Sequence, residues 1–147
     1  MAIATETNTL NSLLRGEMSA IETYRQGIEK LGGDPQDPWI EELRSIQRDH
    51  RDASDALWHH VEQHGGKPSS DSGPWGAFAK AVEGTAKLFG NTAALKALKE
   101  GEEHGLKDYE DALNDQNLPA DCQALIRGLI PRQRAHIARL DGLIARV

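Results

Sequence analysis

Cysteine is almost absent from this 147-residue chain, which contains Cys122 alone. A single cysteine excludes an internal disulfide framework and a metal site built from several thiolates. Long apolar runs are absent as well, since none approaches the ~20 residues that a membrane-spanning helix needs. Residues 1–10 contain no basic segment followed by an apolar one, so a secretory signal is not expected. We therefore expect a cytoplasmic protein that does not insert into membranes.

Basic residues are fewer than acidic ones, and 17 Lys and Arg against 23 Asp and Glu give a formal net charge of −6. Nucleic acids and anionic membranes select basic surfaces, so neither is an expected partner. Glycine-rich phosphate loops and nucleophile elbows are also absent from the sequence. The length and the apolar fraction of 38% suit one compact domain, residues 1–147.

The sequence does contain strong helical periodicity. Apolar residues recur every three or four positions, whereas the alternation typical of half-buried strands is nearly absent. Helices are predicted over about 10–31, 38–64, 91–113 and 120–147. Asp37 is expected to cap the second helix ahead of Pro38, and Asn91 to cap the third. Pro131 lies inside the fourth helix and should kink it.

The composition changes over residues 65–91, where a loop rich in Pro and Ser precedes a short predicted helix over about 75–88. At ~1.5 Å per residue, a helix of that length travels ~21 Å along the molecule. Short loops join the first helix to the second and the third to the fourth. We therefore predict an all-α four-helix bundle of two antiparallel hairpins joined by a long crossover, with the third helix parallel to the second.

The two halves of the chain repeat each other at a few polar positions. In each half, a Gly-Glu pair is followed by a tyrosine seven residues after the glutamate, and by a Gln-Arg-x-His tetrad in the next helix. The members are Gly16-Glu17, Tyr24 and Gln47 to His50 in the first half, and Gly101-Glu102, Tyr109 and Gln133 to His136 in the second. Coincidence at six positions in register is improbable, so we infer an internal duplication.

Periodicity places these polar residues on the apolar faces of their helices. Glu17, for example, lies between Leu14 and Ile21, where a leucine would be expected. The helical rise puts Glu17 and His50 at nearly the same height in the first hairpin. In the second hairpin it matches Glu102 with Gln133 and places His136 about one turn beyond. Two glutamates, two histidines and two glutamines are thus expected in one core layer. Buried charge costs several kcal/mol per ion, so a metal, protons or mutual pairing must neutralise the layer.

These motifs resemble those of the ferritin-like superfamily, in particular rubrerythrin-type domains. The crossover and the length are also similar to those of a bacterial ferritin-like family that is a domain of unknown function. The resemblance implies a ferritin-like four-helix bundle with a metal site in its core. The implied ligands are Glu17, His50, Glu102 and His136, with Gln47, Gln133, Tyr24 and Tyr109 as weak ligands or hydrogen-bond partners.

Glutamine at positions 47 and 133 departs from the family pattern, which has bridging carboxylates there. A di-iron site offsets its charge with four carboxylates, and this chain offers two. One divalent ion is balanced by two carboxylates and two neutral imidazoles, whereas two ions are not. We therefore expect a single Zn²⁺, Mn²⁺ or Fe²⁺, and no oxidase chemistry of the di-iron kind.

Other interpretations stay open at this point. The protein is either a metal-binding ferritin-like protein or a non-enzymatic interaction or stress-related bundle without metal. In the second case, protonated histidines pair with the glutamates and the polar layer fixes the packing of the helices. A pocket for another ligand is a third interpretation. Elsewhere, His60 and His64 have the i, i+4 spacing of a surface metal clamp, which is common by chance. Trp75 is expected to pack against the crossover, and a homodimer contact through Trp75 and Phe78 is the alternative.

Overall fold

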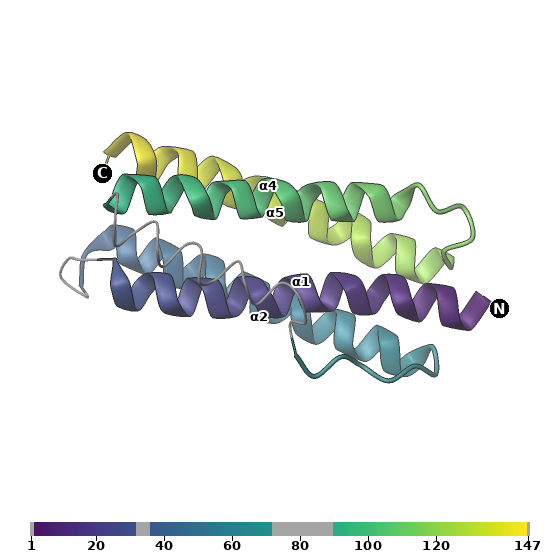
Figure 1. The fold of residues 1–147 in the computed structure, drawn as a ribbon. Helices are drawn as coiled ribbons and strands as arrows, with labels where there is room; N and C mark the ends of the chain where they lie inside the picture. The colour runs from purple at the N-terminus through teal and green to yellow at the C-terminus, as the bar shows by residue number, and fades with distance from the viewer. Residues whose placement is uncertain (1, 32–35, 72–89, 147) are drawn as a thin grey trace.

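The computed structural model describes residues 2–31, 36–71 and 90–146, and the regular structure within them is entirely helical. The helices are α1 (Ala2–Lys30), α2 (Pro38–Gln63), α4 (Asn91–Leu113) and α5 (Ala120–Arg146). Figure 1 shows α1 antiparallel to α2, and α4 antiparallel to α5. The predicted all-α four-helix bundle is therefore confirmed. The short helix predicted over about 75–88 lies outside the described residues.

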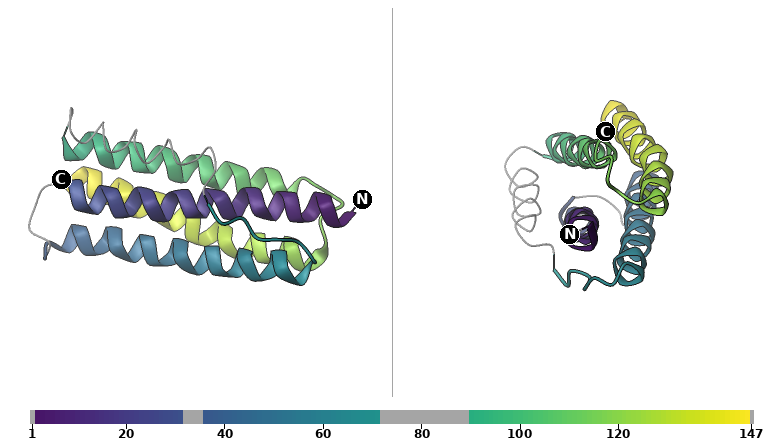
Figure 2. Two further views of the ribbon diagram at one scale, coloured as in Figure 1. Left: turned by 60° about the horizontal axis from the view of Figure 1, so that its bottom comes forward. Right: turned by 90° about the vertical axis from the view of Figure 1, so that its right-hand side faces the viewer.

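The two hairpins are arranged as the predicted crossover requires. α2 ends at the opposite end of the bundle from the start of α4, and α4 runs parallel to α2 (Figure 1). The turned views in Figure 2 show the α4–α5 hairpin lying against the α1–α2 hairpin. No helix in the described part of the chain is both long and apolar enough to cross a membrane.

Local chemistry sets most of the helix ends. Asp37 occupies the N-cap of α2 and Pro38 follows at N1, although the Asp37 side chain makes no capping hydrogen bond within the described residues. The prediction that Asn91 caps the third helix is wrong by one residue, because the N-cap of α4 is Gly90 with a φ of 88°. Glycine adopts this left-handed conformation at less cost than asparagine. α5 continues through Pro131.

Two apolar clusters fill the core on either side of its middle. The first includes Leu10, Leu14, Leu57, Cys122 and Ile126. The second includes Leu43, Ile46, Leu95, Leu140 and Leu143. Full burial of one such aliphatic side chain stabilises the fold by roughly 1.5–3 kcal/mol. These clusters hold the helices together around a layer of buried polar side chains between them.

Candidate metal centre

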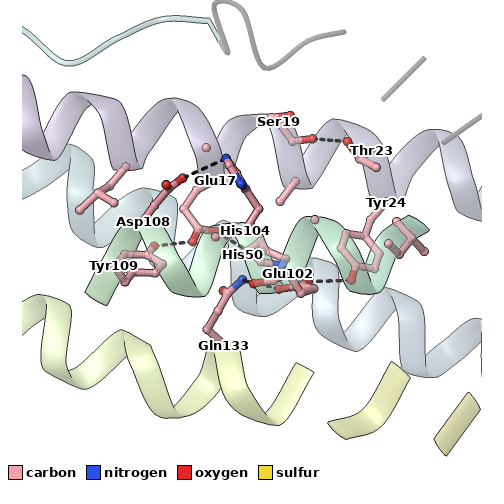
Figure 3. A pocket seen from close by; sticks show the side chains of 16 residues that line it. Glu17, Ser19, Thr23, Tyr24, His50, Glu102, His104, Asp108, Tyr109 and Gln133 are labelled. Atoms are coloured by element: carbon pink, nitrogen blue, oxygen red, sulfur yellow. Dashed lines mark hydrogen bonds and ion pairs between the residues drawn. The ribbon is translucent and has the colours of Figure 1, made fainter. Parts of the chain in front are cut away.

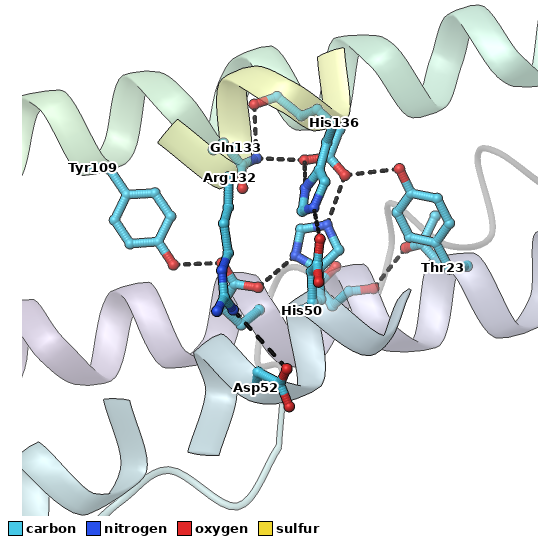
Figure 4. A network of polar contacts seen from close by, with 12 residues as sticks. Thr23, His50, Asp52, Tyr109, Arg132, Gln133 and His136 are labelled. Atoms are coloured by element: carbon cyan, nitrogen blue, oxygen red, sulfur yellow. Dashed lines mark hydrogen bonds and ion pairs between the residues drawn. The ribbon is translucent and has the colours of Figure 1, made fainter. Parts of the chain in front are cut away.

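The polar layer brings together the four residues predicted as ligands, of which Figure 4 labels His50 and His136. Glu17, His50, Glu102 and His136 are each at most 5% exposed. His50 lies at the centre, with its Nδ1 2.5 Å from Glu17 Oε2 and its Nε2 2.6 Å from Glu102 Oε1. The His136 ring lies 4.8 Å from that of His50, and its Nδ1 is 3.4 Å from Glu102 Oε2. The four side chains meet in the core, and their role as metal ligands stays a prediction.

Each core tyrosine forms a hydrogen bond with the glutamate of the other half. The Tyr24 hydroxyl donates to Glu102 Oε1 over 2.7 Å, and the Tyr109 hydroxyl donates to Glu17 Oε1. The resemblance implied hydrogen bonds between these tyrosines and carboxylates, and the structure shows that each bond joins one hairpin to the other. Burial, together with the neighbouring glutamates, raises the pKa of both phenols well above 10. Both hydroxyls are therefore protonated donors at neutral pH.

The two glutamines of the repeat contact different groups. Gln133 Nε2 donates to the Glu102 carboxylate over 2.5 Å and to the Glu102 backbone oxygen over 2.9 Å. Gln47 Nε2 donates to the backbone oxygen of Ile21 over 3.0 Å. Gln47 therefore lies apart from the carboxylates. Gln133 presents its amide nitrogen to Glu102 and stabilises the charge of that carboxylate, and its role as a weak metal ligand stays a prediction.

Asp49 is a residue of this layer that the sequence analysis missed. Its Oδ2 lies 2.8 Å from His136 Nε2, so a carboxylate of α2 holds an imidazole of α5. The repeated tetrads differ at this position, where the second half has Ala135. Alanine has no carboxylate with which to hold His50 in the same way. His50 Nε2 instead contacts Glu102, and comparison of the two tetrads position by position would have shown this asymmetry.

Charge pairing explains how the layer tolerates burial. Both ring nitrogens of His50 face carboxylates, and both can donate only in the imidazolium form. Burial alone would lower the pKa of His50, but Glu17 and Glu102 outweigh it and raise that pKa well above 6.5. Burial alone would likewise raise the pKa of Glu102, but the charge of His50 and the contacts from His136 lower it to about 2. One imidazolium between two carboxylates leaves one negative charge uncompensated.

One buried nitrogen lacks a hydrogen-bond partner among the described residues, and it is His136 Nδ1. Leaving such an atom unpaired costs roughly 1–3 kcal/mol. Asp49 faces Nε2 of His136, and Nδ1 faces Glu102 Oε2 at 3.4 Å without meeting the geometry of a hydrogen bond. Ligand atoms of His50, Glu102 and His136 lie within 4.8 Å of one another. A carboxylate on the far nitrogen is typical of metal-ligating histidines, so these residues fit a divalent ion.

A cavity of about 60 Å³ adjoins this layer (Figure 3). It lies between α1 and α4, and Glu17, His50 and Glu102 reach its wall. Gly101 and Gly105 line it on the α4 side, and a Cβ at Gly105 would lie 2.8 Å from Gln133 Nε2. One water molecule occupies roughly 30 Å³ in the liquid, so water or another small ligand can approach the carboxylates and His50.

The lowered pKa of Glu102 predicts that the metal-free protein loses stability in acid. The folded-state pKa, about 2, lies below the ordinary value of 4.5. The folded state therefore binds fewer protons, and this stabilisation is present above about pH 4.5 and is lost as the pH falls towards about 2. Urea unfolding with a chelator present should show the free-energy difference between wild type and Glu102→Gln shrinking over that interval.

Glu22 provides the control for this pH dependence. Its pKa is also lowered to about 2, through hydrogen bonds from Arg25 and Gln26, but the pair is solvent-exposed. Solvent screening makes exposed pairs weak, so Glu22→Gln should change the free energy of unfolding by less than about 1 kcal/mol at any pH. A Glu102→Gln difference that stays constant between about pH 5 and pH 3 would contradict the charge pairing of Glu102 with His50.

Comparisons with known proteins agree with this architecture. A family described as a domain of unknown function (DUF2383) matches residues 5–115. No curated protein matches the chain. Among solved structures, a ferritin-like, diiron-carboxylate protein from Bacillus anthracis str. Ames is 19% identical, with 98% of each chain covered and a TM-score of 0.77. At this identity the likeness shows the fold, which is the ferritin-like bundle. Because the family match extends over most of its length, the chain belongs to the DUF2383 family.

Proposed function

We propose that this protein binds one divalent transition-metal ion in the core of the bundle, with His50, Glu102 and His136 as ligands. The observation that carries the proposal is the unpartnered Nδ1 of His136, which is buried 3.4 Å from Glu102 Oε2. Two imidazoles and one carboxylate suit Fe²⁺, Zn²⁺ or Mn²⁺. A bound ion would supply a Lewis acid with coordination positions left for water or a small ligand.

Glu17 and Asp49 support this site from outside the ligand set. Glu17 Oε2 contacts His50 Nδ1, and Asp49 Oδ2 contacts His136 Nε2. A carboxylate at the far nitrogen fixes the ring orientation and raises the basicity of the nitrogen that faces the metal. This role for Glu17 differs from the ligand role expected from the sequence, because its carboxylate is engaged by His50 and Tyr109.

Charge balance favours one ion over two. A divalent ion that replaces the imidazolium proton of His50 would be matched by the charges of Glu17 and Glu102, with both imidazoles neutral. A second ion would add two further charges, and neither Gln47 nor Gln133 carries a charge to offset them. Uncompensated charge in a buried layer costs several kcal/mol.

A metal-free polar layer is the second candidate, and one observation favours it. The contacts from Glu17 to His50 and from His50 to Glu102, at 2.5 and 2.6 Å, form a continuous chain without an ion. In this case the layer would set how the two hairpins pack, as a polar layer does when each member has its partner. The protein would then be a non-enzymatic interaction or stress-related bundle.

Anomalous diffraction from crystals of untagged protein separates the two candidates. After reconstitution with Fe²⁺, Mn²⁺ or Zn²⁺, we expect one peak about 2.0–2.2 Å from His50 Nε2, His136 Nδ1 and a Glu102 oxygen. Two peaks about 3.5–4 Å apart would indicate a dinuclear centre and contradict the single ion. No peak in the layer with any of the three metals would support the polar layer instead.

A further inference from the structure

Metal-ligating side chains also gather at one end of the bundle, away from the polar layer. Here the N-terminal part of α1, the end of α2 and the start of α5 lie together (Figure 1). Ligand atoms of His64, Asp121 and Cys122 lie within 4.8 Å of one another. His64 Nε2 is 2.7 Å from Asp121 Oδ2 and 3.3 Å from Cys122 Sγ. Nitrogen, oxygen and sulfur donors thus face one point.

The His64 ring is held in place from its other side. Glu6, only 7% exposed, has its Oε1 3.0 Å from His64 Nδ1. The backbone also turns sharply after His64, because Gly65 has a φ of 78°. Gly66 then packs so closely on α1 that a Cβ there would lie 2.6 Å from Thr7 Cγ2. A buried carboxylate on the far nitrogen is the arrangement that orients metal-ligating histidines, and it leaves Nε2 facing the other donors.

His60, one helical turn earlier, lies near Asp121 but outside the group of three whose ligand atoms lie within 4.8 Å of one another. Its Nδ1 lies 3.2 Å from the backbone oxygen of Ala56. A carbonyl oxygen can only accept, so Nδ1 carries the proton and Nε2 of the neutral ring has the free lone pair. That Nε2 is 4.0 Å from Asp121 Oδ2. The rings of His60 and His64 are nearly parallel, 6.5 Å apart, on the same face of α2.

We propose that His60, His64, Asp121 and Cys122 form a zinc site that links the end of α2 to the start of α5. Two imidazoles, one carboxylate and one thiolate are a donor set that suits tetrahedral Zn²⁺. Zinc bonds of about 2.0–2.3 Å place the ligand atoms of a tetrahedral ion roughly 3.4–3.6 Å apart. The His64–Asp121 and His64–Cys122 pairs, at 2.7 and 3.3 Å, need to separate by less than an ångström, whereas His60, 4.0 Å from Asp121, must move closer to join them.

Access and charge at this end of the bundle also suit an ion. The Asp121 side chain is 53% exposed, so it has room to move and leaves an entry route. Burial raises the pKa of the Cys122 thiol to about 12, so the thiol is a poor nucleophile at neutral pH. Zinc would displace the thiol proton, and the thiolate and the Asp121 carboxylate would together balance its two charges.

A zinc ion in this position would cross-link the two hairpins. α2 belongs to the first hairpin and α5 to the second, and the ligands from each lie more than 50 residues apart in the sequence. An ion that binds the folded state alone stabilises it by mass action. This site shares no residue with the core centre and does not depend on metal in the polar layer.

Cobalt substitution tests this site separately from the core. Cys122 is the only cysteine, so a thiolate-to-cobalt charge-transfer band in the near ultraviolet can arise only here. On titration of the reduced full chain carrying Glu102→Gln, which weakens the competing core centre, we expect the band to saturate at about one equivalent of Co²⁺ and to disappear when about one equivalent of Zn²⁺ is added. Cys122→Ser should abolish the band, whereas Glu102→Gln, which removes a ligand of the core centre, should retain it.

Two further variants keep the thiol and test the other ligands. His64→Gln and Asp121→Asn should each weaken Co²⁺ binding by at least about 10-fold. His59→Gln changes an exposed histidine of the same helix and serves as the matched control, with less than about a 2-fold change expected. A wild-type protein without the band at millimolar Co²⁺, or equal affinities for His64→Gln and His59→Gln, would overturn the proposal. If Cys122→Ser fails to fold, Asp121→Asn tests the proposed zinc site instead, because Asp121 is exposed and lies outside the core.

Discussion

Glu102→Gln should weaken metal binding in the core by at least about 100-fold. Glu102 is the one carboxylate among the three proposed ligands, and its oxygens lie between the two imidazoles. The substitution keeps the shape of the side chain but removes its charge, so a divalent ion would keep only neutral ligands in a buried site. Competition with a chromophoric chelator measures the affinity, and Cys122→Ser as the background removes any contribution from the end of the bundle.

The neighbouring residue gives the control for this experiment. Glu103 follows Glu102 in the sequence, but its side chain is 54% exposed. Glu103→Gln should therefore leave the affinity within about 2-fold of wild type, since surface changes away from a site have small effects. If Glu102→Gln and Glu103→Gln bind metal equally well, the core centre is not the binding site.

His50→Ala should be the most destabilising single substitution in the polar layer, at about 3–5 kcal/mol in metal-free protein. The loss of the imidazolium leaves Glu17 and Glu102 buried and facing each other without a counter-charge. Adding Glu17→Gln and Glu102→Gln to His50→Ala should recover part of that loss, because the amides carry no charge. Urea unfolding in the presence of a chelator gives the free energy of unfolding for each variant.

His59 again provides a matched position, with a side chain 71% exposed next to Glu62. His59→Ala should change the free energy of unfolding by less than about 0.5 kcal/mol. If the triple variant is as unstable as His50→Ala alone, lost packing volume rather than unpaired charge explains the effect. The role assigned to the imidazolium of His50 would then be wrong.

Helix periodicity made both the fold and the residues of the core layer predictable from the sequence. Glu17 and His50 occupy helical positions that otherwise hold leucine and isoleucine, and helix periodicity is a strong signal over such long segments. The repeat then fixed which residues of the second half correspond to them. All six polar residues of the repeat are buried in the structure, as expected.

Pairing within the layer was less predictable, because it depends on side-chain directions that periodicity does not specify. The second tetrad has Ala135 where the first has Asp49, and His50 Nε2 contacts Glu102 of the other hairpin. The cluster of His64, Asp121 and Cys122 at the end of the bundle was equally hard to predict from the sequence. Its members come from the last residue before a glycine turn and from the first turn of α5, where helix ends are hardest to place. The spacing of His60 and His64 alone did not indicate Asp121 and Cys122.

The tyrosine bonds between the hairpins have a consequence for each hairpin taken alone. Tyr24 finds its acceptor in the second hairpin and Tyr109 finds its acceptor in the first, so neither hairpin satisfies its own tyrosine. Tyrosine and glutamate hold the same relative places in both halves. A single hairpin of this kind would therefore satisfy its tyrosine and glutamate by facing a second copy of itself, as in a symmetric homodimer.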